Sequence, residues 1–435
     1  MICDVITNNV NADSTDTSEK IMEYPEILSD KNLCKVRTIT TFIELDFDQS
    51  KWPALIKKAN AFCQTLAHDF KENGYTVQSV RIVTNAFSEY IDTTSLATAQ
   101  QDLRALKKLL DESQQSGIRF RFAIGEATTV EQLSLIPELI KEFGDLCNVC
   151  VNIENDPYSV LDDSMIQAAT KAVNKISQIT PRGEGNFNFT VNFNCDPLIP
   201  YFPASYSRKE TKNQFVIGLE TPDLLVAALR RFHQVNPVLD HKQQMHGYFT
   251  LLSAQLQFHI DQLHTIIKAN HLQQGFEFAG VDSSAAPSKN CASMADVYTL
   301  LGVEHFGAAG TVEASALLTR VFKSIKRVPL VGFSGLMLAL TEDTGLAQGS
   351  QFGHFDIRVL LTYSSVCGIG LDTVPIPGDT AIDKIAALMR DTGTMAFRLN
   401  KPLTVRLFPV PGLQAGDLTA FESDDLCNCN VLAVP

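Results

Sequence analysis

The sequence lacks any uninterrupted apolar run near the roughly eighteen residues that a membrane-spanning helix requires. It also lacks a basic start followed by an apolar stretch and a cleavage site, so we expect no signal peptide and a cytoplasmic protein. No run of Lys and Arg is present, and 36 basic residues stand against 49 acidic ones, for a formal net charge of −13. Such a chain repels polyanions, so we expect neither a nucleic-acid nor a membrane partner.

Complete signatures of the common cofactor sites are missing as well. The ten cysteines are scattered over 435 residues, which indicates reduced thiols in a reducing compartment. Cys147 and Cys150 have a zinc-like spacing but fall in an apparent strand, where their side chains face opposite ways. Gly368 and Gly370 are followed at the third glycine position by Thr373, and then by prolines instead of a helix. We therefore expect no NAD site.

What is present is a pattern of strands alternating with helices. Hydrophobic residues make up 45% of the chain, which is ample for a large core. Residues 1–33 carry seven acidic and two basic residues without a clear period, and this predicts a flexible N-terminal extension. Residues 34–435 are predicted to form a single α/β domain.

About ten strands are expected, including segments near 36–45, 329–340, 358–366 and 402–409. Helices of 10 to 20 or more residues separate most of them, an order typical of βα units and a largely parallel sheet. Periodicity does not distinguish a closed barrel from a large open sheet, because both bury each strand on two faces.

The most unusual stretch is Val366–Asp372 (VCGIGLD), which continues to Asp379 through a proline-rich loop. Here a predicted strand enters a glycine-rich turn bearing Cys367, at a strand end of the kind where ligands bind in α/β proteins. Cys367 is a candidate catalytic thiolate and Asp372 a candidate base or ligand. The alternative is a buried, inert cysteine beside a structural turn.

Acidic residues follow other predicted strands. Asp282 ends one strand, while Glu342 and Asp343 end another. These carboxylates are candidate ligands of a divalent metal, and oxygen donors suit Mg²⁺ or Ca²⁺ better than Zn²⁺. The alternative for the Glu342–Asp343 pair is a solvated cap on the next helix.

Five residues are candidate substrate contacts. Arg37 and Arg406 lie on apolar strands, where arginine needs an anionic partner, so each is either a structural ion pair or a substrate clamp. Gly310 and Thr311 open a helix whose free N–H groups suit a carboxylate or phosphate, although simple capping explains them too. Asp379 is a candidate for substrate binding or for capping the following helix.

These motifs together resemble one known family. VCGIGLD, Ile376–Thr380 (IPGDT) and Arg406–Gly412 (RLFPVPG) resemble the signature of the domain of unknown function 711 family, and Val281–Pro287 (VDSSAAP) and Val36–Thr40 (VRTIT) also fit it. The resemblance implies a pyruvate formate-lyase-like barrel of ten strands surrounded by helices. It does not imply a glycyl radical, because no loop of that kind is present near the C-terminus.

From these features we expect an enzyme that acts on a small polar metabolite through a Cys and carboxylate site at strand ends, with a divalent metal as an option. The alternative is a non-catalytic metabolite-binding or regulatory protein on the same scaffold. The expected partner is a small molecule. The oligomeric state stays open, with a homodimer as one option.

Overall fold

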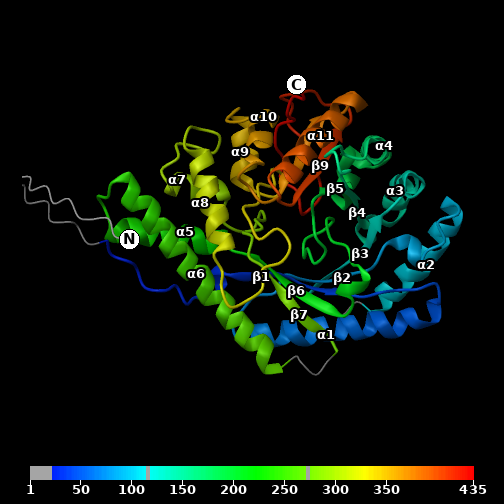
Figure 1. The fold of residues 1–435 in the computed structure, drawn as a ribbon, viewed down its shortest axis with the longest axis horizontal. Helices are drawn as coiled ribbons and strands as arrows, with labels where there is room; N and C mark the ends of the chain where they lie inside the picture. The colour runs from blue at the N-terminus through cyan, green and yellow to red at the C-terminus, as the bar shows by residue number, and fades with distance from the viewer. Residues whose placement is uncertain (1–21, 114–117, 271–274) are drawn as a thin grey trace, which may run out of the picture.

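A computed structural model describes residues 22–113, 118–270 and 275–435, and these residues build one nine-stranded sheet surrounded by helices (Figure 1). The strands are β1 (Lys35–Phe42), β2 (Ser79–Val83), β3 (Arg119–Ala127), β4 (Asn148–Ile153), β5 (Phe189–Phe193), β6 (Gln214–Glu220), β7 (Glu277–Asp282), β8 (Gly370–Pro377) and β9 (Leu403–Val410).

The sheet is mixed, in the order β7-β6-β1-β2-β3-β4-β5-β9-β8. Strands β1 to β5 run parallel to one another. An antiparallel pair joins β6 to one edge of this group and another joins β9 to the opposite edge. The two outer pairs, β6 with β7 and β8 with β9, are internally parallel.

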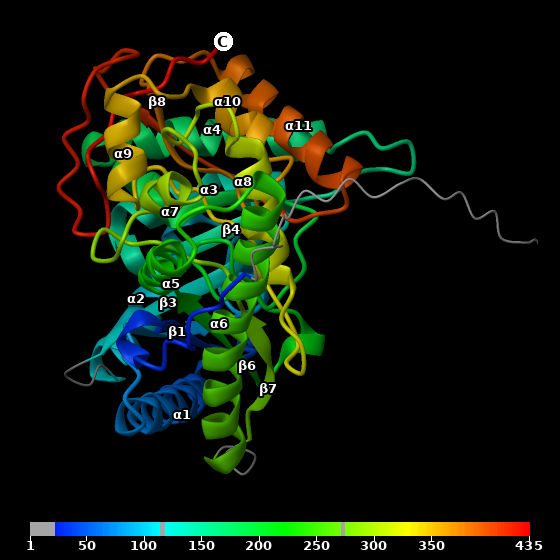
Figure 2. The same ribbon diagram turned by 90° about the vertical axis from the view of Figure 1, so that its left-hand side faces the viewer.

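The helices lie outside the curved sheet. They are α1 (Trp52–Glu72), α2 (Leu96–Ser113), α3 (Val130–Phe143), α4 (Asp163–Ile179), α5 (Pro222–Val235), α6 (His241–Asn270), α7 (Met294–Leu300), α8 (Thr311–Lys323), α9 (Thr344–Gln351), α10 (Ile357–Tyr363) and α11 (Ile382–Arg398). Figure 2 shows the longest of them, α6, running beside β6 and β7. No helix in the described part of the chain is both long and apolar enough to cross a membrane.

Side chains alternate between the two faces of the strands, and this alternation positions the site. In β2, Val80 and Ile82 join the large apolar core, whereas Ser79 and Arg81 turn to the opposite face. In β9, Val405 lies in that core while Arg406 turns away from it. All six residues are buried, so the inner face is polar although it is shielded from solvent.

Two predicted strands are different in the structure. Residues 358–366, expected to be a strand, instead form most of α10 (Ile357–Tyr363) and the turn that follows it, and β8 begins only after Cys367. The run from 329 to 340 forms two isolated bridges, Leu330 with Val281 and Ala339 with Asp372, and no ladder. The α/β class is confirmed with nine strands, whereas ten strands and a closed barrel are not established.

The predicted N-terminal extension is partly packed against the domain. Residues 1–21 lie outside the described part, but residues 22–33 are held by side chains of the α5 and α6 region. Gln255 accepts a hydrogen bond from Leu28 N at 2.8 Å, and Asn236 bonds both the N–H and the carbonyl of Glu23 at 3.0 and 2.7 Å. Pairing of backbone groups by buried amides fixes a segment whose regular structure is limited to a 3₁₀ turn at Lys31–Leu33.

Candidate functional site: an arginine-lined cavity inside the sheet

The polar face of the strands surrounds a cavity, which we call the inner cavity. Basic residues come from four strands, and apolar walls come from the loops after β5 and β7. The charged residues that line it are Arg37, Arg81, Arg121, Glu342, Asp372 and Arg406. Four guanidinium groups therefore meet two carboxylates within one enclosed space of a protein whose net charge is strongly negative.

Arg37 faces this cavity because β1 contains a bulge. Val36 pairs with Leu219 and Thr38 pairs with Gly218, so Arg37 is the extra residue in the ladder to β6. A bulge places two consecutive side chains on the same side of a strand and so re-aims one of them. Without it, Arg37 would share the outer face with Ile39, which packs in the apolar core.

Arg81 and Arg121 are cross-strand neighbours. They pair directly in the parallel register between β2 and β3, and only 5% and 7% of their surfaces are exposed. Arg81 bonds neutral groups, the Ser79 hydroxyl at 3.3 Å and the Pro200 carbonyl at 3.2 Å, and it lies over the Phe202 ring. Among the described residues, no carboxylate comes within ion-pair distance of Arg81. Burial, together with Arg121 and Arg37, lowers its pKa well below the ordinary value.

Arg121 is only partly neutralised. Its nearest carboxylates are Asp145 at 3.3 Å, which is 56% exposed, and Asp425 at 3.9 Å. Its Nε is buried without a hydrogen-bond partner in the described part of the chain. Burial lowers the pKa of Arg121, and Asp145 only partly offsets this. Like charges on neighbouring strands destabilise a sheet, so this pair needs a functional or structural reason.

Arg406 is fully paired. Its Nε donates to Asp372 at 2.7 Å and its Nη2 donates to Glu342 at 2.6 Å, while its guanidinium packs on the Phe187 ring. Burial opposes the charge of Arg406, but the two carboxylates outweigh it and raise the pKa. Arg406, Asp372 and Glu342 form a buried ion triad in the lining of the inner cavity.

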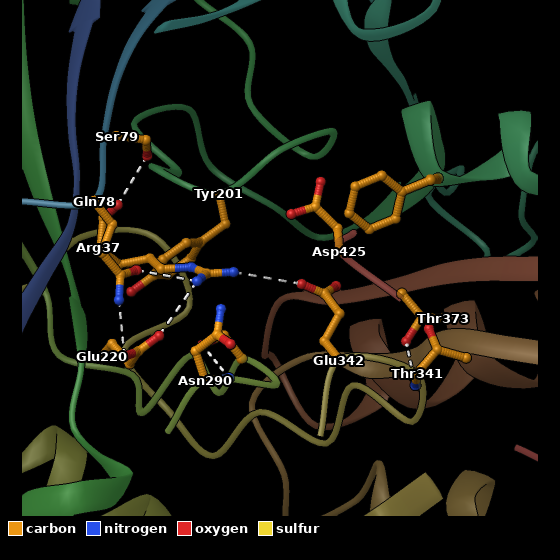
Figure 3. A network of polar contacts seen from close by, with 12 residues as sticks. Arg37, Gln78, Ser79, Tyr201, Glu220, Asn290, Thr341, Glu342, Thr373 and Asp425 are labelled. Atoms are coloured by element: carbon orange, nitrogen blue, oxygen red, sulfur yellow. Dashed lines mark hydrogen bonds and ion pairs between the residues drawn. The ribbon is translucent and has the colours of Figure 1, made fainter. Parts of the chain in front are cut away.

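Glu342 connects Arg406 to Arg37. Its second carboxylate oxygen is 3.8 Å from Nη2 of Arg37, which also pairs with Glu220 at 3.3 Å (Figure 3). Burial raises the pKa of Glu342, although Arg406 lowers it, and the carboxylate keeps 14% of its surface exposed. A carboxyl group with a raised pKa on a cavity wall has the properties of a general acid or base.

A second cavity adjoins the first, and we call it the outer cavity. It shares Arg37, Arg81 and Arg121 with the inner cavity. The lining is completed by Gln78, Ser79, Arg119, Ser288, Asn290 and Asp425. Asp425 lies on the chain after β9 and binds Arg119 with both oxygens, at 2.6 and 2.7 Å. Burial raises the pKa of Asp425, but the hydrogen bonds from Arg119 and the charges of Arg121 and Arg119 outweigh it and lower the pKa to about 2.

Backbone strain occurs beside the cavity. Ala286, Ser334 and Thr373 adopt left-handed φ angles of 40°, 38° and 51°. Each is a cavity residue itself or adjacent to one. Such conformations cost about 1–3 kcal/mol for residues with a Cβ and are concentrated at ligand sites.

Cys367 lies behind the cavity wall. Its side chain is fully buried, its sulfur accepts a hydrogen bond from Gly370 N at 3.4 Å, and it is not among the lining residues. Gly368 packs against Gly335, where a Cβ would come within 2.8 Å of the facing Cα. The glycines therefore allow two backbones to touch. Of the predicted catalytic pair, the structure brings Asp372 to the cavity and leaves Cys367 outside it.

The three predicted metal ligands do not share a site. Asp282 accepts hydrogen bonds from three backbone amides, those of Ser284, Phe333 and Ser334, at 2.8 to 3.0 Å. Burial raises the pKa of Asp282 to about 6. Asp343 caps α9 and also binds Met294 N at 2.7 Å. In the described ranges, no group of three or more His, Cys, Asp or Glu side chains is placed to hold a metal ion.

The remaining predicted contacts are separate from both cavities. Gly310 is the N-cap of α8, and the Thr311 hydroxyl closes the preceding turn by accepting from Gly307 N at 3.1 Å. Asp379 is exposed and accepts a hydrogen bond from Gln414 at 3.1 Å. The helix that follows it, α11, has Ala381 at its N-cap, without a side-chain cap.

Arg81 and Arg121 were missed by the sequence reasoning, although a signal was present. Val80-Arg81-Ile82 and Phe120-Arg121-Phe122 place an arginine between apolar residues, as at Arg406. Strict alternation predicts that such an arginine faces a buried polar surface.

The fold and the site define a helix-covered α/β protein with a buried, arginine-rich cavity. The model of the family described as "Uncharacterised ACR (DUF711)" matches residues 27–423, and the chain belongs to this family. Relatives are called UPF0210 proteins. One from Pyrobaculum arsenaticum is 30% identical over 58% of this chain and 55% of its own length. One from Limosilactobacillus reuteri is 26% identical over 93% of this chain and 92% of its own.

The match therefore spans about half the length of the first of these relatives and nearly all of the second. A solved structure, the anaerobic ribonucleotide reductase from Thermotoga maritima with citrate in the active site, aligns with a TM-score of 0.41 and 9% identity. The alignment covers 85% of this chain and 80% of that one.

Proposed function

We propose that this protein binds a small organic anion in the inner cavity and acts on it as an enzyme. The observation that carries the proposal is the side-by-side pair of Arg81 and Arg121, buried on neighbouring strands, with no carboxylate in the described residues within reach of Arg81. A buried charge is costly unless it is paired. A ligand carboxylate or phosphate would supply the missing partner, and arginine binds both in a planar, two-pronged geometry.

The rest of the cavity favours an organic ligand over a free ion. Phe202, Phe333 and Met337 supply apolar walls opposite the guanidinium groups. Apolar walls beside charged groups suit an organic anion, because its carbon skeleton can contact the former and its charged group the latter.

We assign proton transfer to Glu342, positioned by Arg406. Glu342 keeps part of its surface toward the cavity and has a raised pKa, whereas Asp372 is 4% exposed and held by Arg406. In this assignment the Cys367 thiol stabilises the turn before β8 and does not reach the ligand. A binding protein without turnover is the second candidate, and it is favoured by the ion pairing that already engages both carboxylates.

We also infer that residues 330–339 close the sheet into the ten-stranded barrel of pyruvate formate-lyase type. Support comes from the two isolated bridges, which attach this run to β7 at one end and to β8 at the other. The amides of Val331 and Leu340 donate to Val281 and Asp372 at 3.1 and 3.2 Å. They should exchange with solvent as slowly as amides of β7, and rapid exchange at both would contradict closure.

The ligand proposal is tested by thermal unfolding with a panel of small carboxylates and phosphorylated acids. A ligand at about 100 times its dissociation constant adds roughly 2.7 kcal/mol of stability. We expect a shift in the intact protein that is lost in Arg81→Met and Arg121→Met. Arg358→Met, which removes an arginine that is 73% exposed and pairs with Asp356, is the control and should keep the shift. No shift with any anion would refute the proposal.

A further inference from the structure

The inner and outer cavities are two parts of one binding region. Three arginines, Arg37, Arg81 and Arg121, line both of them. A ligand group bound by Arg81 and Arg121 therefore lies at the junction, with space on either side. The outer cavity is the part nearer to Arg119 and to the loop that carries Ser288 and Asn290.

The charges of the combined lining are unbalanced. Five arginines, the four of the inner cavity and Arg119, stand against three carboxylates, Glu342, Asp372 and Asp425. Glu220, which lies beyond the lining, pairs with Arg37 and Lys35 at 3.3 and 3.0 Å, and Lys35 also pairs with Asp223 at 2.9 Å. Asp145 touches Arg119 and Arg121 but is more than half exposed, so solvent screens it. The lining residues alone have an excess of two positive charges, and Glu220 offsets part of it at Arg37. The remaining excess favours an anionic ligand, and the geometry at Arg119 indicates where a second anionic group would bind.

The outer cavity already holds a carboxylate from the protein itself. Asp425 binds Arg119 through both oxygens, in the two-pronged geometry that a ligand carboxylate would adopt. It sits on a stretch without helix or strand, beside Leu426, which packs with Phe421 and Phe187 in a small apolar cluster. The peptide can therefore stay anchored by its apolar side chains while the Asp425 side chain rotates away.

Building on the proposed function, we propose that the ligand carries two anionic groups. The first is held by Arg81 and Arg121, and the second takes the place of Asp425 on Arg119. The substrate class is thus a short dicarboxylate or a phosphorylated carboxylate. Asp425 occupies the outer cavity by binding Arg119 when the ligand is absent, and it releases Arg119 when the ligand binds.

Matched probes separate one anionic group from two. Binding is measured by titration calorimetry with the α,ω-dicarboxylates from malonate to adipate, each against its monomethyl ester, and with 2-phosphoglycolate against glycolate. We expect at least one dianion to bind at least tenfold more tightly than its matched monoanion. Asp425→Asn should increase this ratio further by weakening the competitor for Arg119, and Arg119→Met should reduce it toward one.

The control is a similar ion pair far from the cavities. Arg390 binds Asp163 through two nitrogens, at 2.9 Å for Nε, so Asp163→Asn should leave every affinity unchanged. If dianions and monoanions bind equally and both depend on Arg81, the two-group inference is wrong and the proposed function stands. If Asp425→Asn and Arg119→Met leave the ratio unmoved, the second group does not bind at Arg119. If no probe binds in an Arg81-dependent way, both proposals fail.

Discussion

Replacement of Arg81 by Met tests the central feature of the site, a buried arginine that lacks a charged partner in the described structure. Like charges on strands about 5 Å apart, at an effective dielectric constant of about 20, repel by about 3 kcal/mol. Met removes this repulsion between Arg81 and Arg121. It also removes two hydrogen bonds to neutral groups and the contact of the guanidinium with Phe202.

The stability lost with these contacts is small, because the groups that Arg81 contacts keep other partners. The Pro200 carbonyl still accepts from the Thr40 hydroxyl at 3.2 Å. A Met side chain replaces the cation–π contact, worth about 1–2 kcal/mol, by a sulfur–aromatic contact of about 0.3–1.5 kcal/mol. We therefore expect the free energy of unfolding to stay constant or rise by up to about 2 kcal/mol. For 435 residues the entropy of unfolding is about 0.9 kcal/mol/K, so Tm should rise by about 0–2 °C.

Arg406→Met is the matched comparison, because Arg406 is equally buried but has two carboxylate partners. Removing it leaves Asp372 without an ion partner and Glu342 with Arg37 alone, at 3.8 Å. We expect a cost of about 3–5 kcal/mol, which corresponds to a fall in Tm of about 3–6 °C. Differential scanning calorimetry of the two variants without ligand gives the answer. Equal falls in Tm would mean that the charge of Arg81 is already compensated in the folded protein, and the reasoning for an anion site would be refuted.

Three further substitutions should change stability or ligand binding in defined ways. In the folded protein the pKa of Asp425 is about 2, against an ordinary 3.8. Its ion pair therefore stabilises the fold by about 2 kcal/mol above pH 4, and this stabilisation is lost as the pH falls toward 2. Urea unfolding should show Asp425→Asn less stable than the intact protein at pH 7, with the gap narrowing below pH 4; a constant gap would contradict this. Cys367→Ala should lower stability by about 1 kcal/mol and keep the Arg81-dependent rise in Tm with ligand, since the sulfur does not line the cavity. Loss of that rise in a folded variant would mean that the thiol takes part in ligand binding. Gly368→Ala should cost about 1–3 kcal/mol by forcing a Cβ against Gly335, and an unchanged Tm would show that the two backbones do not touch.

Local sequence patterns determined most of the secondary structure. The strand-like segments predicted near 36–45 and 402–409 correspond to β1 and β9. These elements depend on contacts within a few residues of one another and on which face is apolar, so the chain itself encodes them. The segment before Cys367 was the exception. A short apolar run with β-branched residues fits a strand or a buried helix, and its tertiary surroundings selected α10.

The sequence also indicated that Arg37, Arg406, Asp372 and Glu342 are unusual, but it could not say which of them meet. Arg406 lies 34 and 64 positions from its partners Asp372 and Glu342, and only the arrangement of β8, β9 and the run before α9 brings the three together. The bulge that turns Arg37 inward depends on pairing with β6, some 180 residues away. The pairing of Arg81 with Arg121 depends on the register of β2 and β3. Register and strand order are set by packing between segments distant in sequence, so only the tertiary structure determined that the arginines gather in one cavity while Cys367 stays outside it.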